Sequence, residues 1–149
     1  MQALVVGLAT GVLGLSAGAL LAEAVLLVPW WRAMEPGAFL AWYPEHADSL
    51  FRFFAPLEIG AGVLAVAATA VAWRSEARSP LAVATALTLA VLLAFPLYFG
   101  AANTSFVEGS LARGEVAGEL ARWSAWHWGR TVLALVAFAA AALGLRRLD

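Results

Sequence analysis

The sequence predicts an all-α polytopic membrane protein, folded as a bundle of four transmembrane helices. Hydrophobic residues make up 63% of the 149 residues and charged residues only 13%, and the mean hydropathy is +0.84. A soluble domain of this size needs a far larger polar surface. We therefore expect residues 1–149 to form a single transmembrane domain.

Four apolar segments are long enough to cross a hydrocarbon core of ~30 Å, which takes about 20 helical residues. They run from about Ala3 to Pro29, Phe54 to Trp73, Leu81 to Gly100 and Trp126 to Leu145. The first lacks the basic start of a signal peptide, exceeds its usual apolar length and contains Glu23, so we expect a mature helix.

The connections between the spans differ in length. Residues 74–80 form a short link between spans two and three, whereas residues 30–53 and 101–122 form longer connections. Residues 34–54 alternate aromatic and charged side chains without reaching span length. This pattern predicts an interfacial helix and turn between spans one and two that could cover a cavity.

The placement of arginine, and not its raw count, predicts the orientation. The side with the longer connections holds five arginines, namely Arg32, Arg52, Arg113, Arg122 and Arg130. With four spans, both termini lie on one side, together with the short link. The arginines on that side occupy very short segments, where the positive-inside rule is strongest; they are Arg74, Arg78, Arg146 and Arg147. We therefore expect a multi-pass protein of the plasma (inner) membrane with cytoplasmic termini. Only one of the seven tryptophans, Trp73, lies toward this side.

Composition also excludes several functions. No cysteine is present, which rules out disulfides, thiolate metal sites, iron–sulfur ligation and cysteine nucleophiles. A net charge of -1 gives no electrostatic reason to bind nucleic acid.

Ionisable side chains are predicted inside the last span. The apolar run from Thr131 to Leu145 is too short to cross the core, so the span must reach back to about Trp126. That places His127 and Arg130 inside or at the edge of the bilayer, where ionisable groups are costly and usually functional. Trp123, His127 and Arg130 share one helical face, and Trp126 and Trp128 project elsewhere.

Other polar residues reach a comparable depth on three more helices. At 1.5 Å per residue, Glu23 lies roughly 9 Å inside Pro29, and Glu58 lies roughly 6 Å inside Phe54. Asn103 follows the third span, either as a ligand at the mouth or as a helix terminator. We expect one shared pocket.

Small residues and one proline predict how the helices pack. Ala55, Glu58, Gly62 and Ala65 form a small-residue stripe on the second span that points Glu58 inward. The first span carries a glycine line, which predicts packing or a homodimer face; its members are Gly7, Gly11, Gly14 and Gly18. Pro96 can kink the third span and create a cavity beside Tyr98 and Asn103.

The polar cluster supports an acid–base hypothesis. A neutral His127 could take a proton from an apolar substrate with an acidic C–H or O–H. Arg130 could hold the resulting oxyanion and Asn103 could donate a hydrogen bond to it. Glu23 or Glu58 could orient the imidazole or relay protons, and oxygen could react with the carbanion without a metal.

Two other hypotheses use the same residues. Glu23, Glu58 and His127, with His46, form a donor set suited to iron, copper or zinc, although no paired spacing supports it; haem would require His46 and His127. Alternatively, His127 and Arg130 snorkel and brace a loop carboxylate such as Glu45 or Glu119, and Glu58 forms a structural ion pair with Arg130. The residues identify no cofactor.

The sequence resembles the anthrone-oxygenase-like family of small four-helix membrane proteins, most of which have no assigned function. The resemblance rests on Glu23 with residues 28–32 (VPWWR), on the stretch from Phe95 to Asn103, and on residues 120–131. Its most specific part is W-x3-H-x2-R with the upstream Asn.

The resemblance implies a polytopic membrane protein, some members of which oxygenate aromatic anthrones to quinones. The residues it implies are Asn103, Trp123, His127 and Arg130. The leading hypothesis is a membrane oxidoreductase acting on a lipophilic aromatic or quinone-like molecule, with Tyr98, Asn103 and Trp123 binding it. The alternative is a non-enzymatic binder, carrier or accessory subunit whose buried charges are structural.

Overall fold

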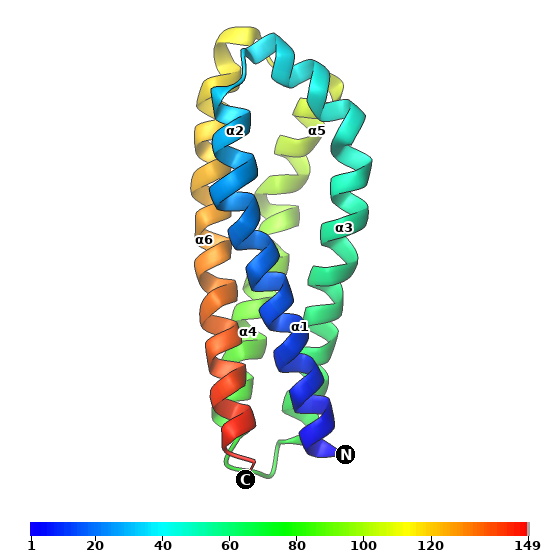
Figure 1. The fold of residues 1–149 in the computed structure, drawn as a ribbon, viewed down its shortest axis with the longest axis vertical. Coiled ribbons are helices and arrows are strands. Elements are labelled where there is room, and N and C mark those ends of the chain that lie inside the picture. Colours follow the sequence, from blue (N-terminus) through cyan, green and yellow to red (C-terminus); the bar gives the residue numbers. More distant parts are fainter. Residues whose placement is uncertain (149) are drawn as a thin grey trace.

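The computed structural model describes residues 1–148 and confirms the predicted four-helix bundle. Four helical stretches are long and apolar enough to cross a membrane: Gln2–Ala33, Pro36–Val71, Arg78–Glu108 and Arg113–Arg146. They stand side by side, with both termini at the same end of the bundle (Figure 1).

The first and third stretches each contain one π-helical turn. The first consists of α1 (Gln2–Ala22), the π-helical turn η1 (Glu23–Leu27) and α2 (Val28–Ala33); the third consists of α4 (Arg78–Ala94), the π-helical turn η2 (Phe95–Phe99) and α5 (Gly100–Glu108). Pro29 is the second residue after η1, and Pro96 lies within η2. Because proline lacks the N–H that an α-helix requires, the helix adjusts its hydrogen bonds there.

The segment expected to form an interfacial helix and turn is the start of the long helix α3 (Pro36–Val71). Its first turns run across the end of the bundle before the helix descends (Figure 1). Pro44 and Pro56 lie inside α3, and internal prolines bend a helix without ending it. The predicted turn is therefore a bend in a continuous helix.

Glu35 caps the start of α3 outside the membrane-spanning stretches. Its carboxylate accepts a hydrogen bond from the Ala38 N–H at 3.0 Å. Hydrogen bonds from the backbone N–H groups of Gly37 and Ala38 hold the pKa of Glu35 below its ordinary value. This cap satisfies a backbone donor that the helix itself leaves free.

The third helical stretch continues past its predicted end at Gly100. It ends at Glu108, and Gly109 follows with a φ of 60°, a left-handed conformation that suits glycine. Helix α6 (Arg113–Arg146) begins soon afterwards. The prediction that Asn103 terminates a helix was therefore wrong, and most of the connection expected over residues 101–122 is helical.

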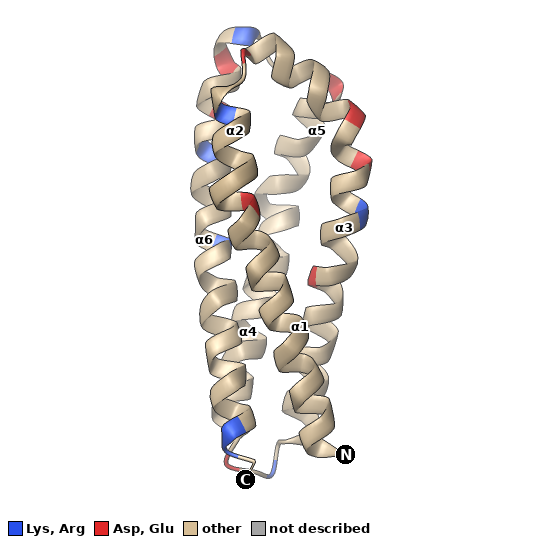
Figure 2. Cartoon of the chain, viewed as in Figure 1, with Lys and Arg blue, Asp and Glu red and all other residues tan. Residues whose placement is uncertain are grey.

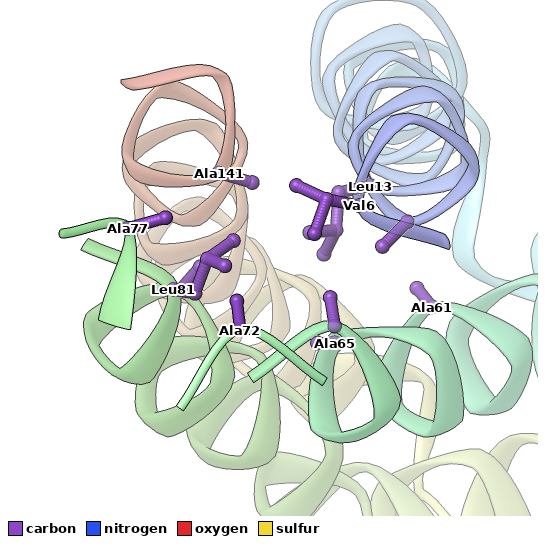
Figure 3. Packing of buried hydrophobic residues seen from close by; sticks show 11 residues of the cluster. Val6, Leu13, Ala61, Ala65, Ala72, Ala77, Leu81 and Ala141 are labelled. Atoms are coloured by element: carbon purple, nitrogen blue, oxygen red, sulfur yellow. The ribbon is translucent and has the colours of Figure 1, made fainter. Parts of the chain in front are cut away.

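The core at the end near the termini is built from small side chains. Alanines of α3 and α6 face Val6 and Leu13 of α1 and Leu81 of α4 (Figure 3). The predicted stripe on α3 lies against α4, because a Cβ added at Gly62 would stand 2.7 Å from Leu92 Cδ1. The Thr85 hydroxyl also donates to the Ala65 carbonyl at 2.8 Å.

The glycine line of α1 does not pack as a whole against the other helices. A Cβ at Gly14 would meet the Phe138 ring, but a Cβ at Gly7, Gly11 or Gly18 would meet nothing within 4 Å. The packing prediction therefore holds only at Gly14. The homodimer alternative stays a prediction.

The outer surface suits a lipid environment. Charged residues gather near the two ends of the bundle and are sparse between them (Figure 2). Large apolar side chains are exposed on the flanks; among them are Leu15, Val63, Val66, Leu93, Val132 and Val136. Trp126 and Trp128 are also exposed, as their helical phase predicted.

Replacing Gly62 with leucine tests the close contact between α3 and α4. We expect Gly62→Leu to destabilise the protein by about 1–3 kcal/mol, because the new side chain overpacks against Leu92. Gly60→Leu is the matched control, since a Cβ at Gly60 meets nothing within 4 Å. Thermal unfolding in detergent measures both, and equal shifts for the two variants would contradict the packing.

Candidate functional site

A cavity of about 560 Å³ lies between α3 on one side and η2 and α5 on the other; we call it the portal cavity. Apolar side chains form most of its walls, among them Leu50, Phe51, Phe54, Ile59, Phe95 and Val107. Charged groups lie along it as well, among them Glu23 of η1, Glu58 of α3 and Arg130 of α6.

The mouth of the portal cavity lies on an apolar flank of the bundle. Phe51, Ile59, Phe95 and Val107 line the cavity and are also exposed on the outer surface. Ile59 and Phe95 lie well away from the ends of their helical stretches. A lipophilic molecule in the bilayer could therefore enter sideways between α3 and η2.

Arg130 is the centre of the charged cluster. Its Nη2 lies 3.2 Å from Glu23 Oε2 and its Nη1 lies 3.4 Å from Glu58 Oε1. Its Nε–H donates to His127 Nδ1 at 3.0 Å, and the guanidinium lies 4.3 Å from the centre of the Phe99 ring. The predicted pair of Glu58 and Arg130 is present, and Glu23 joins it.

The hydrogen bonds of His127 define its protonation state. Arginine Nε can only donate, so His127 Nδ1 must accept and carries no proton. His127 Nε2 lies 2.9 Å from the Leu20 carbonyl oxygen, which can only accept, so Nε2 carries the proton. His127 is therefore neutral in this arrangement, with one tautomer selected.

This arrangement leaves His127 without a free ring nitrogen. The side chain is fully buried and lies behind the residues that line the portal cavity. In the structure His127 orients Arg130, which itself lines the cavity. The predicted use of His127 as the base has no geometric support, whereas Glu23 and Glu58 both reach the cavity.

The cluster contains more negative than positive groups. Two carboxylates, Glu23 and Glu58, pair with the single guanidinium of Arg130, and the neutral His127 adds no charge. All three charged side chains are buried. When both carboxylates are ionised, the cluster carries one negative charge in excess, which is costly in apolar surroundings.

Trp123 and Asn103 form a second polar contact at the cavity wall. The indole N–H of Trp123 donates to Asn103 Oδ1 at 2.9 Å, and both residues line the cavity. The Trp123 ring stacks on His127, with 5.0 Å between ring centres. Asn103 therefore fixes the ring that covers His127, and its amide N–H groups have no hydrogen-bond partner within residues 1–148.

Tyr43 is a site residue that the sequence reasoning missed. Its side chain is only 4% exposed, lines the portal cavity and is held by ring contacts with Trp31, Phe39 and Phe106. Across the described part of the chain its hydroxyl has no hydrogen-bond partner. Phe39, Tyr43 and Ala47 are spaced four residues apart, and this spacing could have predicted one buried helical face.

Tyr98 lies outside the portal cavity, away from the position expected for it. Its hydroxyl donates to Glu119 Oε1 at 2.6 Å, and its ring stacks on Trp126 with 5.1 Å between centres. Glu119 also pairs with Arg122.

The hypothesis that Arg130 snorkels to a loop carboxylate was wrong, because its partners are the intramembrane carboxylates Glu23 and Glu58.

The metal and haem hypotheses gain no donor set from the structure. Across residues 1–148, no three His, Cys, Asp or Glu side chains are grouped so that they could hold a metal ion. Instead, His46 Nδ1 lies 2.8 Å from the Trp42 carbonyl oxygen, and the His46 ring stacks on the Trp42 ring. Arg130 lies against both carboxylates that would have served as ligands.

Comparison with known proteins finds no match for the chain. No protein-family model matches it, and no curated protein or solved structure matches it either. The resemblance to the anthrone-oxygenase-like family therefore stays a prediction. Function has to be inferred from the geometry of the portal cavity.

Removing the guanidinium tests how far the bundle depends on the cluster. We expect Arg130→Met to cost about 3–5 kcal/mol of stability, because it leaves two buried carboxylates unpaired. Adding Glu23→Gln and Glu58→Gln to this variant should restore part of the loss. The control is Arg122→Met, since its exposed side chain pairs with Glu119 and should contribute below about 1 kcal/mol.

The tautomer of His127 can be measured directly. ¹⁵N-histidine labelling gives only two residues to assign, and His46→Gln identifies the signals of His127. We expect a neutral ring with a protonated Nε2 and an unprotonated Nδ1. A protonated Nδ1 would contradict the bond from Arg130.

Proposed function

We propose that the chain is a membrane oxidoreductase that oxygenates a lipophilic aromatic or quinone-like molecule in the portal cavity. One observation carries the proposal: the portal cavity opens on the lipid-facing flank and reaches a buried cluster of Glu23, Glu58 and Arg130. Ligand sites are typically apolar cavities with a few convergent polar groups.

The walls of the portal cavity suit a flat aromatic substrate. Phe54, Phe95, Phe99 and Trp123 line it, and aromatic rings pack well edge-to-face or offset. A substrate dissolved in the bilayer would reach these rings through the mouth without crossing water. Its polar end would then meet the charged cluster.

The cluster can promote proton removal from a neutral substrate. One carboxylate, Glu58 or Glu23, accepts a proton from the acidic CH₂ of an anthrone-like molecule. Arg130 donates three hydrogen bonds within the cluster, so two of its five N–H groups are available for the oxyanion. This assignment replaces His127 as the base and keeps it as a positioning residue.

Dioxygen completes a balanced reaction. The carbanion adds O₂ and takes up a proton to form a hydroperoxide, and loss of water from that hydroperoxide leaves a carbonyl. One CH₂ and one O₂ thus become one C=O and one H₂O, and the proton taken by the carboxylate returns. The chain needs to supply only binding, the base and the oxyanion donors.

The membrane setting completes the proposal. The four apolar helices suit a multi-pass protein, and we place it in the plasma (inner) membrane with both termini in the cytoplasm. The arginines beside the termini and in the short link support this orientation. The open glycine line of α1 would also let two copies of the chain pack as a homo-oligomer.

A second candidate is a non-enzymatic binder, carrier or accessory subunit. It is favoured by one observation: each charged group of the cluster already has a partner, so the cluster can simply brace η1, α3 and α6. In this case the portal cavity would hold a ligand without changing it.

An oxygenation assay separates the two candidates. Purified protein in phosphatidylcholine nanodiscs is given anthrone, and anthraquinone formation and O₂ uptake are measured above empty nanodiscs. We expect Glu58→Gln or Glu23→Gln to lower the rate about 100-fold or more, the usual contribution of a general base.

Glu119→Gln is the matched control, because that carboxyl lies outside the portal cavity beside Tyr98. It should keep the rate of the unmodified protein. Folded protein that binds anthrone but never exceeds the empty nanodiscs would favour the second candidate. Full activity in both Glu58→Gln and Glu23→Gln would overturn the proposed base.

A further inference from the structure

The charges along the portal cavity are unbalanced. Glu23, Glu58 and Glu108 line it, and Arg130 is the one basic residue among the described residues that do so. Glu108 is exposed, so water or lipid headgroups can screen it. Glu23 and Glu58 are buried, so when both are ionised their excess negative charge acts on whatever occupies the cavity.

A free polar group lies in the same cavity. The hydroxyl of Tyr43 has no hydrogen-bond partner within residues 1–148, although the side chain is only 4% exposed. The ring is fixed by its aromatic neighbours, so the hydroxyl cannot easily turn away to find one. Among the described residues, the fully buried side-chain N or O atom without a partner is Trp31 Nε1 and not the Tyr43 oxygen, so the hydroxyl is open to the cavity. It can therefore bond to a ligand that lies there.

The apolar walls favour one sign of ligand charge. Phe51, Phe54, Phe95, Phe99 and Trp123 all line the cavity, and the faces of such rings attract cations. Phe99 already receives the guanidinium of Arg130 at 4.3 Å. An anion would meet aromatic faces and unbalanced carboxylates together, whereas a cation would be attracted by both.

We propose that the portal cavity binds lipophilic cations, namely hydrophobic molecules carrying a protonated amine. The ammonium group lies against Glu58 and Glu23 and donates to the Tyr43 hydroxyl oxygen, while the apolar body occupies the aromatic walls toward the mouth. Such a ligand supplies the one positive charge that the cluster lacks. This binding does not depend on the oxygenase reaction.

A proton can supply the same positive charge, so protons and ligand cations compete. The titratable and charged groups that face the cavity or the cluster are Glu23 on η1, Tyr43 and Glu58 on α3, Glu108 on α5, and His127 and Arg130 on α6. Cation binding should therefore weaken as the pH is lowered over a range in which the amine stays protonated.

Three anthracenes of similar size provide the test. 9-(Aminomethyl)anthracene is a cation at neutral pH, 9-(hydroxymethyl)anthracene is neutral and anthracene-9-carboxylate is an anion. Each is titrated into the protein in phosphatidylcholine nanodiscs, with empty nanodiscs as background. Energy transfer from tryptophan to anthracene reports binding, because Trp123 lies in the cavity wall.

We expect the cation to bind about tenfold or more tightly than the alcohol, and the carboxylate to bind weakest. Glu58→Gln should bring the affinities for cation and alcohol close together, since it removes the excess charge. Glu119→Gln removes one carboxyl outside the cavity and should leave the preference unchanged, which controls for net charge. Tyr43→Phe should weaken the binding of the cation more than the binding of the alcohol.

The outcomes are decisive because each compares ligands on one folded protein. Equal affinity for cation and alcohol, or tighter binding of the carboxylate, would overturn the proposal, as would a cation preference that survives Glu58→Gln and Glu23→Gln. The anthrone assay is read separately. A cation preference without oxygenation would leave this inference standing and reject only the oxygenase.

Discussion

The bundle depends on one guanidinium placed among three helical stretches. Arg130 of α6 pairs with Glu23 of η1 and Glu58 of α3, and through His127 it is linked to the Leu20 carbonyl of α1. In apolar surroundings each of these groups alone would be costly. The carboxylates and the guanidinium therefore require one another, which fixes how far the helices can move apart at this level.

The π-helical turns explain why the cluster and the portal cavity coincide. Glu23 is the first residue of η1, where the Val28 N–H bonds the Glu23 carbonyl five residues back, and a change of register locally alters backbone pairing. The Leu20 carbonyl just before it accepts from His127. On the opposite side, Phe95, Pro96 and Phe99 of η2 line the cavity. Both irregular turns thus contribute directly to the site.

Hydrophobic run length was sufficient to predict the four spans, because bilayer thickness sets the number of residues needed. Helical phase also identified the buried face with His127 and Arg130. The π-helical turns could not be predicted, since a one-residue change of register leaves composition unaltered. Tyr43 was missed because the second span was started at Phe54, although the helix begins at Pro36. The positioning role of His127 could not be predicted either, because it depends on a contact with the Leu20 backbone carbonyl oxygen of another helix.

The charge of the cluster connects the proposed chemistry with the proposed ligand class. A proton that passes from a neutral substrate to Glu58 leaves the total charge of the site unchanged, so Arg130 can stabilise the new oxyanion without further compensation. A substrate that arrived as an anion would instead add its negative charge to a cluster in which two carboxylates face one guanidinium. Under both proposals, the same electrostatics would admit neutral acids and cations and reject carboxylates. On this view Arg130 keeps the cluster close to neutrality, and the remaining negative charge selects what enters from the lipid.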